Sequence, residues 1–399
     1  VSSIATDVTL QYDTGTATSG ICGDNLTWDL DQDGTLVIRG TGAMTDYDPD
    51  NNRSPWSSRY DIKKVIIQDG VTTIGAWAFN SCWYLTSIEI PNSVTRIGSH
   101  CIRFCGRLLD LVIPDSVTQI DSYAFDFNYL EKITLPPNIT CIEDFTFNGS
   151  SNLTSITVPD GVTRIGSWAF AQCPNLVTVE IPDSVESIDT FAFALSTSLN
   201  RISLPDGLTS IENGLFSGCS ALTSVDIPDS VTTIGDQTFD ECYSLLHVTI
   251  PNSVTNIGTI AFKGSGLVDI TLPSNLDSIA SETFAACANL TSITIPTSVT
   301  YIGYDAFSYC TNLKTVNYTG SPEQWNTIGI TSGNSALKNA SINFYYTDAS
   351  ALSFDENSIS DTMVEGGTES GIAAFSSSDD QVFTSTSPFT GLVPGTDYS

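Results

Sequence analysis

Prolines recur through the middle of this chain at nearly constant separations of 22 or 23 residues. A period of roughly 20–50 residues indicates a stack of equivalent units, because each unit is too small to bury its own apolar side chains. The register extends beyond the prolines and defines eleven units over residues 68–318. The prolines are Pro91, Pro114, Pro136, Pro159, Pro182, Pro205, Pro228, Pro251, Pro273 and Pro296. This period predicts a solenoid in which neighbouring units share one core.

Each unit carries apolar side chains at fixed positions, counted from the proline as position one. Position seven is Ile in all eleven units, and position twelve is Phe in ten of them, with Ile102 the exception. Each unit ends in an alternating stretch such as Leu222–Ile227, which predicts a short strand that the next proline ends. A Val-Thr-x-Ile stretch near the start of the unit predicts a second, shorter extended segment. We expect the run from position eight to position twelve to form one helical or 3₁₀ turn that places the Phe in the core.

One unit shows the pattern well: residues 228–250 read PDSVTTIGDQTFDECYSLLHVTI. This pattern resembles the 23-residue class of the bacterial BspA-like leucine-rich repeat, and the resemblance covers about two thirds of the chain. It implies a leucine-rich-repeat solenoid of α/β, horseshoe-like form. It also implies a secreted or wall-attached protein of a host-associated bacterium, from a family generally linked to adhesion.

The segments that flank the repeats are expected to cover the ends of the core, as solenoids require. Two strands joined at Asp31–Gly34 predict a β-hairpin before the repeats, and Ser321 is the expected N-cap of a short helix after them. Near the C-terminus, Gly391–Tyr398 resembles a turn of fibronectin-type-III-like modules. The predicted organisation is a tail at 1–19, an N-terminal β cap at 20–67, the repeats at 68–318, a C-terminal cap at 319–346 and a Ser/Thr/Gly-rich tail or small β module at 347–399.

The charge of the chain limits the partners it can bind. Only 14 Lys and Arg residues stand against 45 Asp and Glu residues, which gives a formal net charge of −31. A field of this sign repels nucleic acid and anionic lipid, so we expect no nucleic-acid partner. No apolar run reaches the ~20 residues of a membrane-spanning helix. No signal peptide is recognisable at Val1, and its absence does not argue for the cytoplasm.

The ten cysteines follow the repeat rather than a disulfide or zinc pattern. Seven of them occupy position fifteen, where the remaining units place Asn or Ser, so small hydrogen-bonding residues are interchangeable there. Side chains stacked about 4.8 Å apart and pointing the same way do not suit a disulfide, and the chain has no Cys-x-x-Cys pair for zinc. We expect a structural ladder of buried free thiols and an amide, made of Cys82, Cys105, Asn128, Cys173, Cys219, Cys242, Cys287 and Cys310.

Catalytic and metal-binding patterns are weak in this sequence. Asp29, Asp31 and Asp33 match the opening of a calcium loop, but its twelfth position is Gly40 instead of Glu, so a plain hairpin turn is favoured over calcium. His100 and His247 are more than six repeats apart, and no nucleophile motif is present. We therefore expect no catalytic residues, no metal and no cofactor.

Three surfaces are candidates for binding. Arg103 and Arg107 form a possible basic spot for an acidic partner. The outward strand position, twenty-two, is mostly small and polar, and it is kept as a candidate because the concave side is the usual docking face of leucine-rich repeats. Position ten is aromatic or His in the first six units only, and stacking of the rungs would align these side chains into one column, either as core or as an exposed binding strip. The column consists of Trp77, His100, Tyr123, Phe145, Trp168 and Phe191.

These observations favour a non-enzymatic, extracellular or surface-attached interaction protein. We expect it to be a monomer that binds an unidentified protein or glycan, with adhesion to host or neighbouring cells as the role implied by the resemblance. Two alternatives stay open: a structural spacer, or an accessory domain of a larger surface enzyme.

Overall fold

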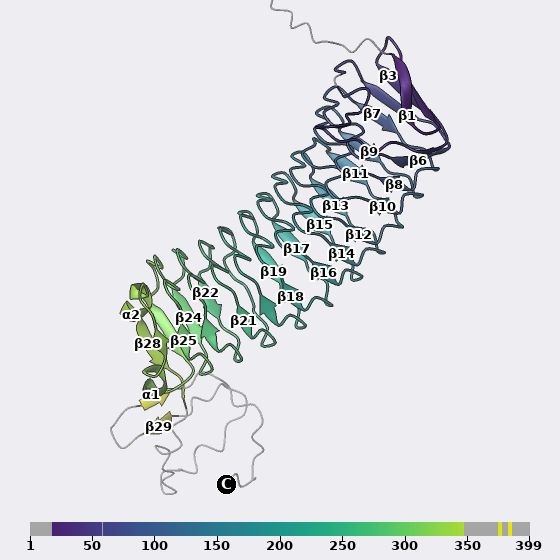
Figure 1. The fold of residues 1–399 in the computed structure, drawn as a ribbon. Coiled ribbons are helices and arrows are strands. Elements are labelled where there is room, and N and C mark those ends of the chain that lie inside the picture. Colours follow the sequence, from purple (N-terminus) through teal and green to yellow (C-terminus); the bar gives the residue numbers. More distant parts are fainter. Residues whose placement is uncertain (1–17, 58, 347–373, 377–381, 385–399) are drawn as a thin grey trace, which may run out of the picture. The chain divides into compact units, whose positions relative to one another are not determined.

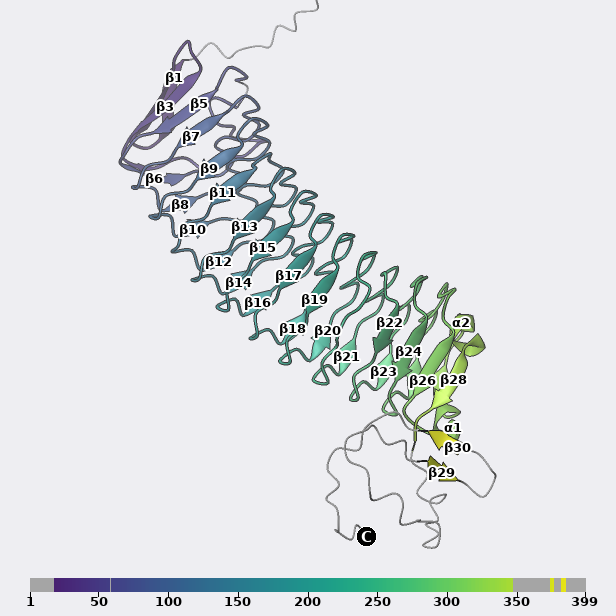
Figure 2. The ribbon, with the colours of Figure 1, turned by 180° about the vertical axis from the view of Figure 1, so that it is seen from behind.

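A computed structural model describes residues 18–57, 59–346, 374–376 and 382–384. The chain divides into two units, Val1–Phe344 and Tyr345–Ser399. Within Tyr345–Ser399, β29 (Ala374–Ser376) pairs antiparallel with β30 (Val382–Thr384). Residues 1–17 of the predicted tail at 1–19, and the expected turn at Gly391–Tyr398, lie outside the described residues. The described residues from 18 to 344 form a continuous stack of similar rungs, which confirms the predicted solenoid (Figures 1 and 2).

Each repeat contributes a strand to each of two rows, except the eighth, whose residues 247–249 form no strand in the first row. Paired strands within a row are parallel (Figure 2). Residues paired between rungs are 22 or 23 positions apart in the repeats, as in Ser155 with Thr178 and Arg164 with Ser187, so the sequence period is the rung spacing. The first row is β5 (Lys64–Ile67), β7 (Ser87–Glu89), β9 (Asp110–Val112), β11 (Lys132–Thr134), β13 (Ser155–Thr157), β15 (Thr178–Glu180), β17 (Arg201–Ser203), β19 (Ser224–Asp226), β22 (Asp269–Thr271), β24 (Ser292–Ile295), β26 (Thr315–Tyr318) and β28 (Ser341–Phe344). The second row is β4 (Gly42–Ala43), β6 (Val71–Ile74), β8 (Arg96–Ile97), β10 (Gln119–Ile120), β12 (Cys141–Ile142), β14 (Arg164–Ile165), β16 (Ser187–Ile188), β18 (Ser210–Ile211), β20 (Thr233–Ile234), β21 (Asn256–Ile257), β23 (Ser278–Ile279), β25 (Tyr301–Ile302) and β27 (Gly329–Ile330).

The repeat proline ends the first-row strand and starts a tight turn. Its carbonyl accepts a hydrogen bond from the backbone N–H of position four, at 3.1 Å for Pro91 and Val94 and at 3.0 Å for Pro114 and Val117. Because proline has no N–H to offer a neighbouring strand, the ladder stops there and the chain turns toward the second row.

The third part of each rung is a run of turns, and here the predicted helical or 3₁₀ turn is not confirmed. Position ten has a positive φ in every repeat, from 51° at His100 to 63° at Tyr123, and position fourteen does so as well. A left-handed residue cannot continue a right-handed helix, so the run folds into consecutive turns. Its backbone instead bonds to the next rung, for example from Phe170 N–H to the Ala192 carbonyl at 2.8 Å.

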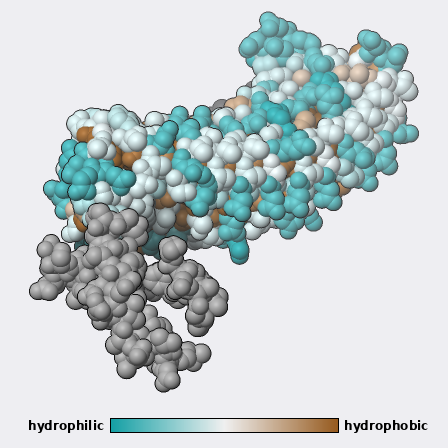
Figure 3. Space-filling view, turned by 90° about the horizontal axis from the view of Figure 1, so that it is seen from below, coloured by the Kyte–Doolittle hydropathy of each residue, from teal (hydrophilic) through white to brown (hydrophobic). Residues whose placement is uncertain are grey.

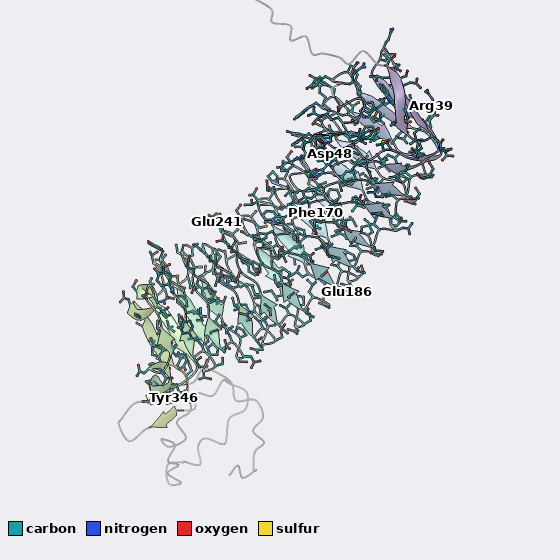
Figure 4. The ribbon with its side chains drawn as sticks, in the orientation of Figure 1. Arg39, Asp48, Phe170, Glu186, Glu241 and Tyr346 are labelled. Carbon is teal, nitrogen blue, oxygen red and sulfur yellow. The ribbon has the colours of Figure 1, made fainter. Side chains whose placement is uncertain are left out.

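The core of the solenoid is a column of stacked phenylalanines at position twelve. From Phe125 to Phe307, rings of successive units lie 5.2–5.8 Å apart between centroids, with interplanar angles of 5–22°. All are essentially inaccessible to water, and Ile102 fills the same place in the second unit. Figure 4 shows Phe170 inside the stack, whereas Glu186 and Glu241 lie at opposite edges.

A ladder of hydrogen bonds from position fifteen supports this column. The thiols of Cys173 and Cys219 donate to the carbonyls of Phe147 and Phe193 in the preceding units, at 3.2 and 3.1 Å. Ser196 makes the same contact with the Phe170 carbonyl at 2.7 Å, which explains why Cys and Ser can replace one another. Asn128 differs, because its amide donates to the Phe125 carbonyl within its own unit. All ten cysteines are free, and nine are buried.

The N-terminal cap covers the first rung with aromatic rings. β1 (Ser19–Gly23) pairs with β2 (Leu26–Leu30), and β2 forms the predicted hairpin with β3 (Thr35–Gly40). Trp56 is fully buried and stacks on Phe79 with ring centroids 5.9 Å apart, so it extends the phenylalanine column by one ring. Its indole N–H donates to the Ala78 carbonyl at 2.7 Å. The cap thus covers the apolar end of the first rung and donates a hydrogen bond to one of its backbone carbonyl groups.

The C-terminal cap closes the other end with two short helices, α1 (Pro322–Trp325) and α2 (Ser335–Asn339), and strand β28. Ser321 is the N-cap of α1 and forms a capping box with Gln324, as the sequence predicts. Asn334 accepts the backbone N–H of Phe307 at 3.0 Å and donates to the Gly303 carbonyl at 2.9 Å. These bonds replace those that a further rung would make. Among the described residues, no helix is long and apolar enough to cross a membrane.

The phenylalanine column predicts a large cost for removing one ring. Phe193→Ala would open a cavity between Phe170 and Phe216, and we expect a loss of about 3–5 kcal/mol in the free energy of unfolding. Urea unfolding followed by circular dichroism measures this loss. The control Glu186→Ala changes an exposed side chain and should shift stability by less than about 0.5 kcal/mol. Equal effects of the two substitutions would contradict a continuous core.

The buried thiols predict low chemical reactivity. Burial raises the pKa of Cys173 and of Cys219 to about 12, so at pH 8 almost no thiolate is present to react. We expect iodoacetamide to leave both residues unmodified in the native protein and to label them after unfolding in guanidinium chloride. Mass spectrometry of the labelled peptides measures this. Native labelling of either residue, or a disulfide between them, would refute the ladder.

Candidate functional site

The position-ten residues share a backbone geometry that sets their side chains in line. The six column residues all have φ between 51° and 63°. In five of these residues, all but His100, the backbone N–H bonds to the next rung, as from Trp168 to the Thr190 carbonyl at 3.2 Å. The same bond repeats from unit to unit, and it holds consecutive side chains at the rung spacing.

The structure brings all six predicted column residues together as one continuous stack. The centroid distances are 4.1 Å from Trp77 to His100, 4.7 Å from His100 to Tyr123 and 4.5 Å from Tyr123 to Phe145. The stack continues at 6.0 Å to Trp168 and at 4.7 Å to Phe191, and interplanar angles stay between 3° and 29°. Every ring is half-buried. The faces of the four internal rings are covered by neighbours, so the column presents mainly ring edges to solvent.

The column ends at Gly214, which is position ten of the seventh unit. The ring of Phe191 lies over this glycine, and a Cβ at Gly214 would overlap the ring. The next units place Gln237, Ile260, Glu282 and Asp305 at this position with the same positive φ. The backbone geometry therefore does not depend on an aromatic side chain, and the rings are a feature of the N-terminal half alone.

One end of the column contains a buried carboxylate beside an imidazole and a guanidinium. Asp126 is 1% exposed, and its oxygens lie 3.2 Å from His100 Nδ1 and 2.9 Å from Arg103 Nε. The Arg103 guanidinium also lies over the rings of Phe104 and Phe127, at 4.5 and 5.4 Å from their centroids. Arg103 is therefore engaged by Asp126 and by aromatic faces, and it stabilises the turns of the second and third units.

The two arginines of the predicted basic spot have different surroundings. Arg107 is exposed and lies over the ring of Tyr84, 4.8 Å from its centroid. Within the part of the chain that the structure describes, no carboxylate forms an ion pair with Arg107. Arg107 is thus available to an acidic ligand, whereas Arg103 is not.

Arg107 lines a pocket of about 670 Å³ that sequence reasoning missed. The pocket extends over the first three units and the end of the N-terminal cap, and most of its lining is aromatic. A signal was present, because position sixteen is Trp or Tyr in the first and third units and Gly in the second. The lining residues are Tyr60, Asp61, Trp83, Tyr84, Gly106, Arg107 and Tyr129.

A second pocket, of about 370 Å³, lies over the eighth to tenth units and has a different character. Its lining includes Asp240, Tyr243 and Lys263, and Lys263 pairs with Glu282 at 2.6 Å. Burial, with help from the negative charge of Glu241, raises the pKa of Asp240 to about 6. This carboxyl group therefore takes up its proton as the pH falls through about 6, rather than near 4.

The strand face and the predicted calcium turn show ordinary surface contacts. At position twenty-two, Thr157 donates to the Glu180 carboxylate at 2.8 Å, which links two rungs. In the hairpin turn, Asp31 accepts the backbone N–H groups of Asp33 and Thr35 at 2.9 and 2.8 Å, and the Thr35 bond is the main cause of its lowered pKa. Across the described ranges, no three His, Cys, Asp or Glu residues converge as a metal site would require.

Comparison with protein-family models identifies the repeat. The model described as "BspA type Leucine rich repeat region (6 copies)" matches residues 56–177, 118–246, 168–287 and 233–365. The chain belongs to the BspA-type leucine-rich repeat family. A search of curated proteins found no match.

Solved structures of bacterial leucine-rich repeat proteins resemble this BspA-type chain. One from Bacteroides ovatus is 25% identical, covers 81% of this chain and 98% of its own length, and has a TM-score of 0.56. One from Eubacterium ventriosum is 22% identical, covers 84% and 98%, and has a TM-score of 0.51. A leucine rich cell surface protein from Faecalibacterium prausnitzii is 27% identical, covers 80% and 99%, and has a TM-score of 0.49.

The raised pKa of Asp240 predicts a pH-dependent stability for this BspA-type protein. The folded state holds this proton more tightly than the unfolded state, whose pKa is near 3.8, so its stabilising contribution is full below about pH 4 and is lost as the pH rises through about 6. We expect Asp240→Asn to raise the Tm at pH 8 and to give no gain at pH 4, as measured by differential scanning calorimetry. Asp229→Asn, at an exposed position, is the control and should show no such pH-dependent difference. A gain that is equal at both pH values would contradict the assigned cause.

Proposed function

We propose that this protein is a non-enzymatic, secreted or cell-surface interaction module that binds a protein or glycan partner through the N-terminal half of its solenoid. One observation carries the proposal: at position ten, partly exposed aromatic or His side chains occur in the first six units and in none of the later five. Position ten has the same φ in later units such as those of Gln237 and Glu282, so the fold itself does not require rings there. A surface enriched in Trp and Tyr beyond the needs of folding is typical of binding surfaces.

The surroundings of the column support this assignment. Its rings are held rigidly by the backbone bonds between rungs, so a partner that contacts their edges need not order them. The hydrophobicity of the face seen in Figure 3 is low, with only scattered apolar spots along a mostly hydrophilic or neutral surface. A partner would therefore gain most from the aromatic region, and family membership supports a place at the bacterial surface with adhesion as the role.

The absence of enzymatic activity belongs to the same proposal. His100 faces the buried Asp126 within the column, and His247 lies in the eighth unit beside the exposed Asp269, 3.3 Å away. Neither pair adjoins an activated nucleophile in the described residues, and the family is generally a scaffold for interaction. A passive spacer is the second candidate function, but a spacer would have no use for an aromatic column at position ten that is restricted to one half of the rod.

Substitution within the column tests the proposal. The triple variant Trp77→Ala, Tyr123→Ala and Trp168→Ala should weaken saturable binding to immobilised mucin, fibronectin or arrayed glycans at least tenfold, because it removes the ring edges that a partner would contact. Surface plasmon resonance measures the binding, and circular dichroism measures the Tm. We expect the Tm to fall by only a few degrees.

The matched control is Gln237→Ala, which changes the same position of a later unit with the same backbone geometry. It should leave binding unchanged. Loss of most thermal stability in the triple variant with binding intact would show that the column is only core. No saturable binding by the native protein to any of these surfaces would favour the spacer.

A further inference from the structure

The pocket over the first three units owes its shape to a missing side chain. Trp83 lies against Gly106 of the next unit, and a Cβ on that glycine would come within 2.7 Å of Trp83 Cε3. The glycine therefore leaves room for the indole of Trp83 to extend across the second unit toward Tyr129. The centroids of the Trp83 and Tyr129 rings are 6.4 Å apart. Trp83 and Tyr84 remain 43% exposed, and Tyr129 remains 37% exposed. These large rings are neither part of the core nor covered by one another.

Ring geometry separates this pocket from the column. In the column, internal rings are covered on both faces by parallel neighbours. In the pocket, one face of Trp83 stacks on Phe104 at 6.3 Å between ring centroids, and Trp83 meets Tyr129 at 49°. Trp83 and Tyr129 therefore form the walls of a corner, with ring surface left open. An open aromatic face suits the C–H groups of a sugar ring, because these carry partial positive charge and the aromatic face is negative.

The charge of the pocket is unlike that of the rest of the rod. Asp61, the acidic residue in the lining, has both carboxylate oxygens bonded by Arg59, at 2.9 and 2.7 Å. That pair is neutral, which leaves the exposed Arg107 as the uncompensated charge. Residues 18–107 carry ten acidic and eight basic side chains, a net −2, whereas residues 108–346 carry 24 acidic and six basic ones, a net −18. An anionic group is thus repelled along most of the solenoid and accepted at this end.

From this geometry, and building on the proposed function, we propose that the pocket binds a carboxylate-bearing sugar at the end of an acidic glycan. The sugar ring packs on Trp83 and Tyr129, and its carboxylate pairs with the Arg107 guanidinium, whose planar fork of N–H groups matches a carboxylate. A volume of about 670 Å³ lies within the range of about 300–1,000 Å³ typical of small-ligand pockets. An acidic protein is less suitable, because a partner burying about 800 Å² would extend onto the strongly acidic rungs.

Titration of the full chain with matched sugars tests the proposal. The probes are 3′-sialyllactose and a glucuronate-containing disaccharide as acidic sugars, and lactose as the neutral one, with binding followed by calorimetry and ligand-observed NMR. We expect at least one acidic probe to bind at least tenfold more tightly than lactose. Arg107→Gln should remove this preference, whereas Trp83→Ala should weaken binding of every probe at least tenfold.

Two controls keep the test specific. Tyr243→Ala removes an exposed ring from the same repeat position of the eighth unit and should leave sugar binding unchanged. The Tm of each variant shows that it is folded, and if Trp83→Ala unfolds, Arg107→Gln still decides the charge preference. Equal affinity for acidic and neutral probes, or no binding of either acidic probe, would overturn the proposal.

The outcome can be separated from that of the proposed function. Partner binding that depends on the column but survives Arg107→Gln would leave the interaction module standing and refute the sugar pocket. Saturable binding of a Glu-rich peptide at Arg107, without binding of the acidic sugars, would overturn the glycan assignment in favour of a protein partner.

Discussion

The structure depends on one constraint: no rung can satisfy its own core or its own backbone. Phe170 is buried only because Phe147 and Phe193 lie on either side, at 5.3 and 5.6 Å. Its N–H is satisfied by the Ala192 carbonyl, and its carbonyl accepts the Ser196 hydroxyl of the next unit. Neighbouring rungs therefore both bury each other's apolar side chains and supply each other's backbone hydrogen bonds. The two caps exist for the same reason, since Trp56 and Asn334 replace a missing neighbour at each end.

Stacking also converts a repeat position into a surface. Residues 22 or 23 positions apart in the sequence lie directly above one another. When several successive units carry the same kind of side chain at one repeat position, these side chains therefore form a line along the rod. Position ten gives the aromatic column, and position sixteen gives the pocket. Glycine sets the limits of both: Gly214 ends the column beneath Phe191, and Gly106 makes room for Trp83. Small local differences between near-identical rungs thus create the individual features of the protein.

Much of this could be predicted from the sequence because contacts between rungs are encoded by the period itself. The strands, the position-twelve core, the free thiols and the order of the column rings all follow from which residues recur. The basic spot could not be resolved in the same way. Arg103 and Arg107 are four residues apart in one unit, yet the first is engaged by the buried Asp126 and the second is exposed beside Tyr84. Their difference depends on residues of other units, which a single repeat does not reveal.

The sequence by itself determined the solenoid, because a fixed proline and phenylalanine period allows only one arrangement that buries the rings. The tertiary structure alone decided the backbone of the turns and the pocket. Trp77, Gln237 and Glu282 share a left-handed φ that none of these residue types prefers, because hydrogen bonds to the next rung impose it. The pocket likewise arises where Trp83, Gly106 and Tyr129 of three separate rungs meet, and that meeting depends on side-chain volume in space rather than on any pattern within one unit.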